Sequence, residues 1–561
     1  MKKILSFLLA LSMFSILFAS SSVVGGDASA YGAEAIIRVG LYYGNDALPA
    51  ANLANEIGSG YIFGWIDNTD YFTEVGYTFE EKITVIKDKN LYLKNSVYYD
   101  SLPPAGSDTI GAFHVQSAAP LYNYDEAYFI ASDLKRTGVQ AFPAYVSGEW
   151  YVRAGSFTSL DAANAARAQV GLPDGTAVGG SQTCYTVVVT STGEFLFEFD
   201  TSGASYLAIN PTGAPQPVTW FKGYKYHGMF EYRRNNGNDI TVIGVLPVGD
   251  YAKGVVPYES NPKWNIEALK AQAICASSYA IYSAGRHASM GFDICNTTCC
   301  QVYRGLNSAT GNSNAACDAV HGLALYSEGK ICSTVYHSSN GGSTEAAKNV
   351  WTTDYSYLQA VPDTFEDLDS ANYGRWSYTY TGEEIAWVLN QKGYSIGTVT
   401  KAYIEEFTPA GNVFRVSFED ARGTYHSFTK ERARSILGSD TLKKYTHSQR
   451  YTISTGGINL FVNSAQSQIS ADKGTLVISG DGKIGSLASD ERVYIQSSIG
   501  VTSVDSKARQ GVFTVSGTGW GHNVGLSQWG AKGRADAGWS YQQILEYYFT
   551  GARVIPIPLD W

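Results

Sequence analysis

A glutamate, several polar blocks and a group of thiols are the features of this sequence whose residue types and spacing could carry chemistry. Glu259 follows Pro257 and precedes a run with helical periodicity, so we expect it to lie in a loop. Loops on a rigid scaffold often carry functional side chains. The alternatives are a solvated loop glutamate or a partner for the positive end of the next helix. Glu267 competes with it, but a place in the first turn of that helix accounts for Glu267, and Asp250 is typical of a turn.

Two polar blocks, residues 336–345 and 519–531, are candidate ligand-binding segments. Gly341 and Gly342 would let the backbone approach a ligand closely. The alternative for the first block is a polar loop that caps a helix beginning near Thr344. In the second block Trp520 and Trp529 could stack on a ligand, but burial is favoured for such large aromatic side chains. The candidate binding residues are Tyr336, His337, Ser338, Ser339, Gly341, Gly342, Thr344, Glu345, His522, Ser527 and Gln528.

A short run of cysteines predicts either a metal site or a disulfide. Zinc prefers four ligands drawn from Cys and His, and an environment outside the cell would permit either outcome. The chain has 7 cysteines, and an odd number leaves at least one that is free, ligates a metal or pairs between chains. The disulfide alternative joins the run to Cys317 or Cys332. The candidate zinc ligands are Cys295, Cys299, Cys300 and, as a weaker fourth, His287.

Composition bounds the class of protein that positions these residues. A length of 561 residues predicts two to four domains, and 44% hydrophobic residues suffice for a real core. The net charge of -10 argues against nucleic acid, because binding to phosphates is driven mainly by Lys and Arg. A neutral or weakly charged polymer is easier to accommodate.

The first thirty residues indicate export. Lys2 and Lys3 precede a short apolar run at residues 4–18, and the small residues at 28–30 suit a cleavage site. The run is shorter than the roughly 20 residues that a membrane-spanning helix needs. We therefore predict a signal peptide at residues 1–30 and a location in the cell wall or outside the cell. An uncleaved N-terminal membrane anchor is the alternative.

The rest of the chain predicts a multidomain α+β protein. Residues 31–107 form a β-rich segment that opens with a strand at 36–41, and residues 191–561 form a larger, mostly β domain with a few helices. In the larger domain, residues 220–232 and 238–246 are strand-like, and the clearest helix covers 265–282. Asn265 can cap that helix.

Between these segments, residues 108–190 predict a small domain of order β-α-β-β-α-β, the split-βαβ arrangement. Its expected elements are strands at 113–116, 141–146, 150–154 and 184–189, with helices at 127–135 and 160–170. The segment resembles a sporulation-related repeat (SPOR) domain, because it starts Phe-His-Val-Gln and continues with Trp-Tyr-Val-Arg-Ala-Gly-Ser-Phe at 150–157 and an alanine-rich helix. That resemblance implies binding to glycan strands stripped of their peptides. Any α+β sandwich with this element order is the alternative.

A second resemblance covers residues 220–561. The stretch Leu-Pro-Val-Gly-Asp-Tyr-Ala-Lys-Gly-Val-Val-Pro-Tyr-Glu at 246–259 leads into Trp-Asn-Ile-Glu-Ala-Leu-Lys-Ala-Gln-Ala at 264–273. With residues 295–305 and the two polar blocks, it resembles the SpoIID family of stage II sporulation wall hydrolases, also called the SpoIID/LytB family. The run Ile-Ile-Arg-Val-Gly-Leu at 36–41 resembles the start of SpoIID-like domains, so the SPOR-like unit could be an insertion.

The SpoIID resemblance implies a peptidoglycan lytic transglycosylase with Glu259 as the acid and then the base. The carboxyl would protonate the glycosidic oxygen, and the carboxylate would then take the proton of the same sugar's 6-hydroxyl, which leaves a 1,6-anhydro end. The resemblance also adds Gln301 and Tyr303 to the expected substrate-binding residues. No cofactor is required for this chemistry.

The resemblance also bears on metal and partners. Some SpoIID-like proteins hold a structural zinc in the 295–300 loop, although many have a His where this chain has Cys299. Expected partners are peptidoglycan glycan strands and another wall hydrolase such as an amidase, since the LytB branch is described as an amidase enhancer. A non-catalytic enhancer is therefore the second hypothesis. A peptidase that uses the thiols with His337 is the third and least supported.

Overall fold

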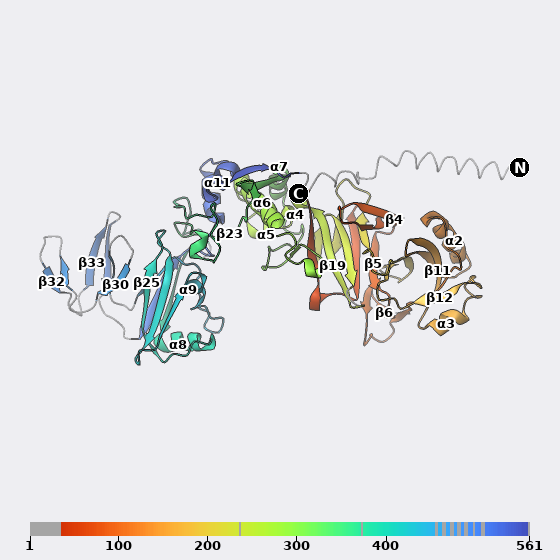
Figure 1. Cartoon of the computed structure of the whole chain (residues 1–561), viewed down its shortest axis with the longest axis horizontal. Coiled ribbons are helices and arrows are strands. Elements are labelled where there is room, and N and C mark those ends of the chain that lie inside the picture. The colour runs from red at the N-terminus through yellow and green to blue at the C-terminus, as the bar shows by residue number, and fades with distance from the viewer. Residues whose placement is uncertain are drawn as a thin grey trace. The chain divides into compact units, whose positions relative to one another are not determined.

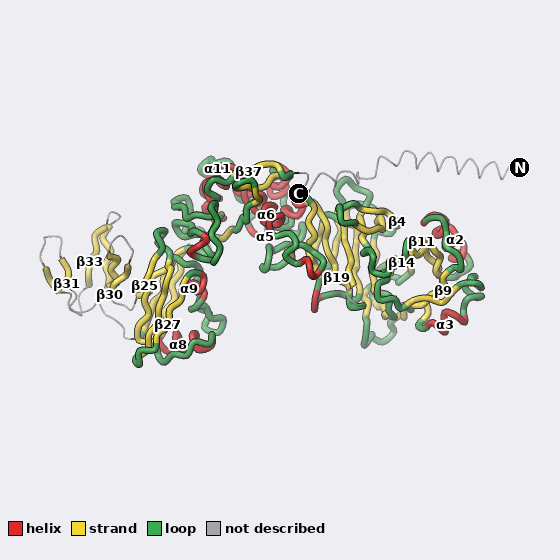
Figure 2. The backbone as a smooth tube through the Cα atoms, viewed as in Figure 1, coloured by secondary structure: helices red, strands yellow, loops and turns green. Residues whose placement is uncertain are grey.

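The computed structural model describes residues 35–558 except for short gaps, and between 455 and 510 it describes the backbone alone. The gaps are residues 235–236, 372–373, 455–457, 463–466, 472–475, 479–483, 487–491, 498–499 and 506–510. The described chain is mixed α+β with several sheets, as predicted (Figure 1, Figure 2). It divides into two compact units. The first comprises Met1–Pro262, Ala280–Leu323 and Pro556–Trp561, and the second Lys263–Tyr279 and Ala324–Ile555.

A seven-stranded sheet in the first unit holds the strand that leads to Glu259. Its order is β20 (Ile294–Cys295), β1 (Ile36–Tyr42), β19 (Ile240–Pro247), β18 (Met229–Arg234), β15 (Ala208–Pro211), β3 (Tyr61–Ile66) and β4 (Phe72–Thr78). All eight residues of β19 are buried, which matches their nearly continuous apolar sequence. β1 pairs antiparallel with β19, so the strand predicted at 36–41 lies beside a strand that follows about two hundred residues later in the sequence. This pairing is what the insertion alternative expects.

A ten-stranded sheet forms the rest of the first unit's framework. Its order is β12 (Thr176–Gly179), β9 (Phe113–Gln116), β11 (Glu149–Phe157), β10 (Ala141–Val146), β14 (Phe195–Asp200), β13 (Tyr185–Val189), β5 (Lys82–Lys87), β2 (Ala50–Ile57), β16 (Val218–Phe221) and β17 (Tyr224–Tyr226). Nearby lies a small sheet of β7 (Val97–Tyr99), β6 (Leu91–Lys94) and β8 (Asp108–Ile110). The segment expected as one strand at 220–232 is divided among β16, β17 and β18.

The split-βαβ order predicted for residues 108–190 is present, with one strand in error. The elements follow one another as β9, α2 (Tyr124–Arg136), β10, β11, α3 (Leu160–Ala165) and β12. The fourth strand is β12, whereas the predicted strand at 184–189 is β13, which pairs with β14 and β5. Four of the five residues of β13 are buried, and this suits a central strand better than an edge. The SPOR identity of the unit stays a prediction.

The second unit contains the two polar blocks and most of α6 (Ile266–Tyr282), the helix predicted at 265–282. The Asn265 side chain accepts a hydrogen bond from the Glu267 amide, as the predicted cap requires. Glu267 itself contacts Lys270 and the Tyr541 amide, which confirms its structural role.

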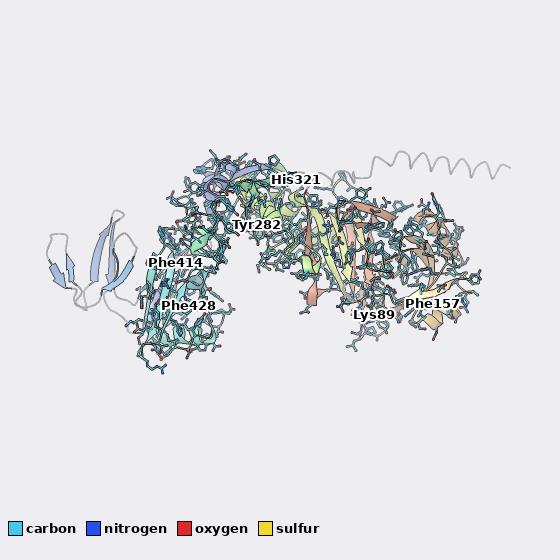
Figure 3. All side chains as sticks on the ribbon, viewed as in Figure 1. Lys89, Phe157, Tyr282, His321, Phe414 and Phe428 are labelled. Atoms are coloured by element: carbon cyan, nitrogen blue, oxygen red, sulfur yellow. The ribbon has the colours of Figure 1, made fainter. Side chains whose placement is uncertain are left out.

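The second unit holds an apolar core between residues 376 and 515 that includes Phe428, which Figure 3 labels. One sheet of this unit has the order β24 (Arg375–Thr381), β35 (Val512–Thr518) and β28 (Tyr451–Ser454). A second has the order β25 (Val399–Phe407), β26 (Val413–Asp420) and β27 (Tyr425–Thr429). A third has the order β22 (Lys330–Ile331), β21 (Leu323–Ser327) and β37 (Arg553–Pro556). The helices are α8 (Gly382–Gln391), α9 (Glu431–Ser435), α10 (Gln528–Asp536) and α11 (Tyr541–Tyr548). Three hairpins pair β29 (Ile458–Val462) with β30 (Ser467–Ala471), β31 (Leu476–Ile478) with β32 (Ile484–Ser486), and β33 (Arg492–Ser497) with β34 (Gly500–Asp505).

Residues 1–30, where a signal peptide or anchor is predicted, lie outside the described residues. Among the helices that the structure describes, none combines the length and the apolar character needed to cross a bilayer.

Candidate functional site

Glu259 ends a one-turn helix that follows directly from the buried strand β19. The chain leaves β19 through α4 (Val248–Lys253) and enters α5 (Val256–Glu259). The expectation of a loop is therefore wrong. Pro257 sits at the start of α5, where a missing amide hydrogen costs nothing and its fixed φ favours the helix. The amides of Glu259 and Ser260 donate to Val255 and Val256 at 3.1 and 2.9 Å, so the backbone that carries the carboxyl is fixed.

The block at 301–305 packs against α4 and Gly254, just before this helical turn. The rings of Tyr303 and Tyr251 stack with centroids 5.0 Å apart, and the Gln301 amide donates to the Tyr251 hydroxyl at 3.3 Å. A Cβ on Gly254 would lie 2.4 Å from the Tyr303 ring, so only glycine permits this approach. Gln301 and Tyr303 are each 3% exposed. Both residues support the segment that carries Glu259, and their predicted contact with substrate stays a prediction.

An ion pair fixes the other side of the segment. The Lys253 ammonium lies 2.9 Å from Asp250 and 2.8 Å from Asp318 on α7 (Gly311–Ala319). Burial opposes the charge on Lys253, but the two carboxylates outweigh it and raise its pKa. Asp250 belongs to the first turn of α4 rather than to an irregular turn. Glu259, by contrast, is half-buried and therefore reachable from solvent.

The four predicted zinc ligands converge in the first unit. Donor atoms of His287, Cys295, Cys299 and Cys300 all lie within 4.8 Å of one another. His287 Nε2 is 3.3 Å from Cys300 Sγ and 4.0 Å from Cys299 Sγ. Cys295 is held in β20, whose partner in the sheet is β1, while His287 precedes the 3-10 turn η3 (Ala288–Met290). All seven cysteines are free thiols in this structure, so the disulfide to Cys317 or Cys332 is not formed.

Burial and local hydrogen bonds set the pKa values of the thiols and the imidazole in this cluster. Burial raises the pKa of the Cys300 thiol to about 12. Burial acts in the same direction on Cys295, but hydrogen bonds from Thr297 and Cys300 outweigh it and lower its pKa. Burial and the neighbouring Arg286 lower the pKa of His287, which keeps its imidazole neutral as a metal ligand must be. Three thiols and one imidazole form a donor set that fits a closed, structural zinc site.

The two polar blocks meet in the second unit. β23 (Tyr336–His337) pairs in parallel with β36 (Leu526–Ser527), which aligns His337 with Ser527. Ser339 and Trp520 exchange two backbone hydrogen bonds, at 3.1 and 2.8 Å, and the Trp529 amide donates to the Ser338 carbonyl. Gly341 has φ +74°, and a Cβ there would lie 2.7 Å from the Thr518 backbone, so its glycine is required. The structure thus brings the two candidate segments together, while their contact with a ligand stays a prediction.

A carboxylate that the sequence did not single out joins these blocks. Glu366 accepts hydrogen bonds from the Ser339 hydroxyl at 2.8 Å, the Asn340 amide at 2.8 Å, the Gly341 amide at 2.9 Å and the Ser527 hydroxyl. Burial raises its pKa, although the Ser527 hydrogen bond opposes the shift. Glu366 lies in an acidic stretch of irregular sequence, so only its spatial neighbours reveal its function.

Other predicted binding residues turn out to be internal. Glu345 is fully buried, and its carboxylate accepts from Ala346, Asn349, Thr408 and Asn412 at 2.5–2.9 Å. The Thr344 hydroxyl accepts from the Val361 amide at 2.8 Å, just before the 3-10 turn η4 (Ala347–Asn349). Gln528 donates to Gln272 at 3.2 Å. These side chains stabilise the loops, while Tyr336, Ser338, Gly342 and His522 retain partial exposure.

The tryptophans and histidines of the region differ in exposure. Trp520 is 39% exposed, so burial was the wrong expectation for it. Trp529 is partly exposed, and its ring meets that of Trp264 edge-on at 5.2 Å. The ring centroids of His337 and His522 lie 5.4 Å apart, and burial lowers the pKa of His337 to about 3. The peptidase hypothesis, which pairs the thiols with His337, stays a prediction.

Comparison with known proteins supplies the family. Residues 236–326 match the family described as "SpoIID: Stage II sporulation protein". This chain carries a SpoIID-family region. The matched residues include Glu259, the four-residue thiol and imidazole cluster and the 301–305 block, so the SpoIID region contains the first unit's candidate site.

Relatives extend the likeness well beyond that stretch. The chain is 30% identical over 323 residues to the amidase enhancer of Bacillus subtilis, covering 53% of this chain and 39% of the relative. It is 28% identical to an uncharacterised protein of Brachyspira hyodysenteriae, over 59% of this chain and 73% of that protein. It is 23% identical to stage II sporulation protein D of Bacillus amyloliquefaciens, over 58% of this chain and 77% of that protein. The chain thus spans about two fifths of the length of the amidase enhancer, and the names of these relatives indicate a cell-wall and sporulation theme.

Proposed function

We propose that this protein is a peptidoglycan lytic transglycosylase with Glu259 as its acid and base. The observation that carries the proposal is the position of Glu259. Glu259 is half-buried at the end of α5, and the segment that leads from β19 into α5 is fixed by the contact of Tyr303 with Tyr251 and Gly254. A general acid must be held rigidly while its carboxyl stays within reach of a substrate.

The chemistry needs one carboxyl and no added water. The Glu259 carboxyl gives its proton to the bridging oxygen between two sugars while the bond from that oxygen to C1 breaks. The carboxylate then accepts the proton of the 6-hydroxyl of the same sugar, whose oxygen bonds to C1. The products are a chain with a new 4-hydroxyl and a 1,6-anhydro end, and the enzyme regains its starting proton. Each assisted proton transfer typically contributes about 10²–10⁴ in rate.

The test is the mass of the ends released from purified, peptide-free glycan strands. Wild-type protein should release anhydro ends, which are lighter by one water than reducing ends. Glu259→Gln should lower the rate by about 10³-fold or more, because the amide cannot deliver a proton. Glu56→Gln, a change at a carboxylate that pairs with Lys225 in the same unit, is the matched control and should keep full activity. Undiminished release by Glu259→Gln would exclude it as the acid.

A second candidate function is a non-catalytic enhancer of a peptidoglycan amidase, and the 30% identity to the Bacillus subtilis amidase enhancer favours it. The two functions separate in one assay with purified wall, an amidase and this protein. An enhancer would raise the release of peptides by the amidase without making new sugar ends. A transglycosylase would make anhydro ends when the amidase is left out.

We propose that His287, Cys295, Cys299 and Cys300 hold a structural zinc ion. Four protein ligands would leave no open position for substrate, so a bound zinc would hold the 287–300 loop against β1 and take no part in the reaction. A wall substrate also agrees with the export signal predicted at residues 1–30, and with the predicted glycan binding of the split-βαβ unit.

A further inference from the structure

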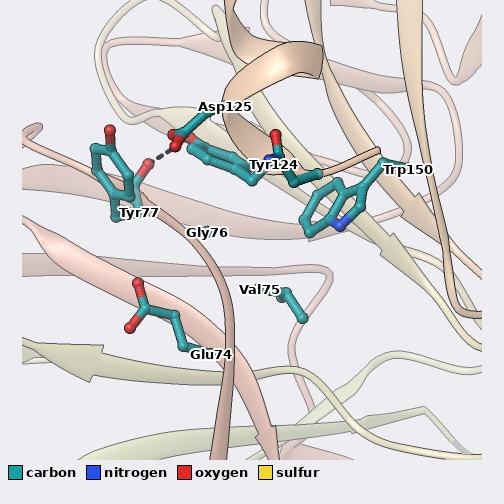
Figure 4. Close-up of a pocket in the computed structure, with 8 residues that line it drawn as sticks. Glu74, Val75, Gly76, Tyr77, Tyr124, Asp125 and Trp150 are labelled. Atoms are coloured by element: carbon teal, nitrogen blue, oxygen red, sulfur yellow. Dashed lines mark hydrogen bonds between the residues drawn. The ribbon is translucent and has the colours of Figure 1, made fainter. Parts of the chain in front are cut away.

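An open pocket of about 280 Å³ lies in the first unit, where β4, the start of α2 and β11 meet (Figure 4). It is separate from Glu259 and from the thiol and imidazole cluster, because it shares no lining residue with either. Sites for small molecules usually measure about 300–1,000 Å³, so this pocket suits a single ring-sized unit.

Aromatic rings form one side of the pocket. The Tyr124 ring lies between Tyr77 and Trp150, with centroid distances of 5.2 and 5.5 Å. Tyr124 is fixed, since its hydroxyl donates to the Tyr77 carbonyl at 2.6 Å and its ring lies on the backbone of Gly76. A Cβ on Gly76 would come within 2.6 Å of that ring. The aromatic wall is therefore preformed.

Two carboxylates face the same space. Glu74 extends from β4, and Asp125 lies in the first turn of α2, close to Tyr77 (Figure 4). Neither carboxylate forms an ion pair with a basic side chain in the part of the chain that the structure describes. Burial and the neighbouring Asp125 raise the pKa of Glu74. Asp125 also suits the positive end of α2, but Glu74 has no such structural explanation.

We propose that this pocket binds a sugar ring that carries a free ammonium group, such as a glucosamine unit without its N-acetyl group. Aromatic faces attract cations and pack against flat apolar surfaces. The carboxylates would accept hydrogen bonds from the ammonium and would balance its charge. An N-acetyl group would remove that charge and add bulk. The choice of a sugar rests on the proposed wall-glycan function, whereas the preference for a cation rests on the pocket alone.

The experiment compares two glycan probes by calorimetry with the full exported chain at pH 6. The probes are a glucosamine tetramer and a fully N-acetylated glucosamine tetramer. We expect the amine tetramer to bind about tenfold more tightly. The double variant Glu74→Gln/Asp125→Asn should abolish the difference. Its matched control is Asp133→Asn, which removes an exposed carboxylate paired with Arg136 on the same helix and should leave binding unchanged.

The outcomes are decisive because Glu74 and Asp125 keep part of their surface in solvent and their amides are close in shape, so the variants should fold. Equal binding of the two tetramers, or a preference that survives the double variant, would overturn the site. A lysine-containing peptide that binds as tightly as the amine tetramer would overturn the sugar assignment. Amine-selective binding by a wild-type protein that releases no anhydro ends from glycan strands would support the pocket while the proposed catalytic function failed.

Discussion

At the scale of single residues, the best-supported site of the first unit is the cluster of His287, Cys295, Cys299 and Cys300. These side chains come from a turn, a strand end and the loop that follows it, yet their donor atoms gather within 4.8 Å. Uncharged thiols would gain little from such crowding. The zinc ion proposed above would account for it, because bound metal draws thiols together as thiolates and balances their charge.

We therefore predict about one zinc ion per chain, with Cys300→Ser losing most of it. Removing zinc with a chelator should lower the melting temperature of the wild type by roughly 5 °C or more, since metal-binding energy is folding energy. Metal analysis and thermal unfolding measure the two effects. Cys317→Ala changes a cysteine of the same unit that lies outside the cluster and should keep its metal. A wild-type protein purified with zinc present but free of metal would contradict the assignment.

At the scale of elements, the second unit is organised around the contact of β23 with β36. This short parallel pair brings together blocks that are almost two hundred residues apart in the chain. Only two residues pair on each strand, so side chains must stabilise the contact. Glu366 does so, because each of its oxygens accepts two hydrogen bonds, which together come from Ser339, Asn340, Gly341 and Ser527.

Glu366→Gln should destabilise the second unit by about 1–3 kcal/mol, because the amide nitrogen cannot accept the bonds that one carboxylate oxygen accepts. Chemical denaturation followed by hydrogen exchange at β23 and β36 would measure the loss. The control is Asp369→Asn, three residues after Glu366, which removes an exposed ion pair between Asp369 and Arg375. It should change the free energy of unfolding by less than about 1 kcal/mol. If the two variants unfold alike, Glu366 does not hold the blocks together.

At the scale of the whole first unit, a buried ionic network joins the split-βαβ strands to the rest of the ten-stranded sheet. Glu198 of β14 meets Arg153 of β11 at 2.7 Å and His114 of β9 at 3.2 Å, and Asp88 lies beside them. Because β10 pairs with β14, the SPOR-like unit continues this sheet. Deleting residues 108–190 would remove part of the sheet, so point variants are the better test of glycan binding.

This network predicts that the first unit loses stability as the pH rises. Burial opposes the charge on His114, but Glu198 outweighs it and raises its pKa, while burial and Glu198 raise the pKa of Asp88 to about 7. Both groups bind protons more tightly when folded, so their stabilisation is fully present below about pH 4 and is lost as the pH rises through about 7. Arg153 is the other charged neighbour and does not titrate in this range. The loss should be on the order of 1–3 kcal/mol.

Hydrogen exchange of β9 and β14 amides from pH 5 to 8 would measure this dependence. The His114→Gln protein should be less stable at pH 5 and should show a flatter profile, since one of the two titrating groups is gone. His426→Gln changes a partly exposed histidine of the second unit and serves as the control. A wild-type stability that rises over this interval would contradict the direction of the pKa shifts.

Much of the local structure could be predicted from the sequence, because it depends on neighbours along the chain. The helix at 265–282 and its Asn265 cap, the strand at 36–41 and the hairpin at 141–154 follow from periodicity, capping and turn residues. The four candidate zinc ligands were also identifiable, since they lie within fourteen residues. Pro257 was misjudged as a sign of a loop, because proline is equally suited to the first turn of a helix.

The amino-acid sequence alone determined that Glu259, the thiol cluster and the polar blocks carry the candidate chemistry, since these are residue types at fixed spacings. Only the tertiary structure decided which of them face solvent. Gln301, Tyr303 and Glu345 proved to be internal supports, Trp520 proved exposed, and Glu366 and the pocket at Glu74 and Asp125 came to light. The physical reason is that burial and hydrogen bonding depend on residues distant in the chain. Local sequence does not encode which distant segments come together around a side chain.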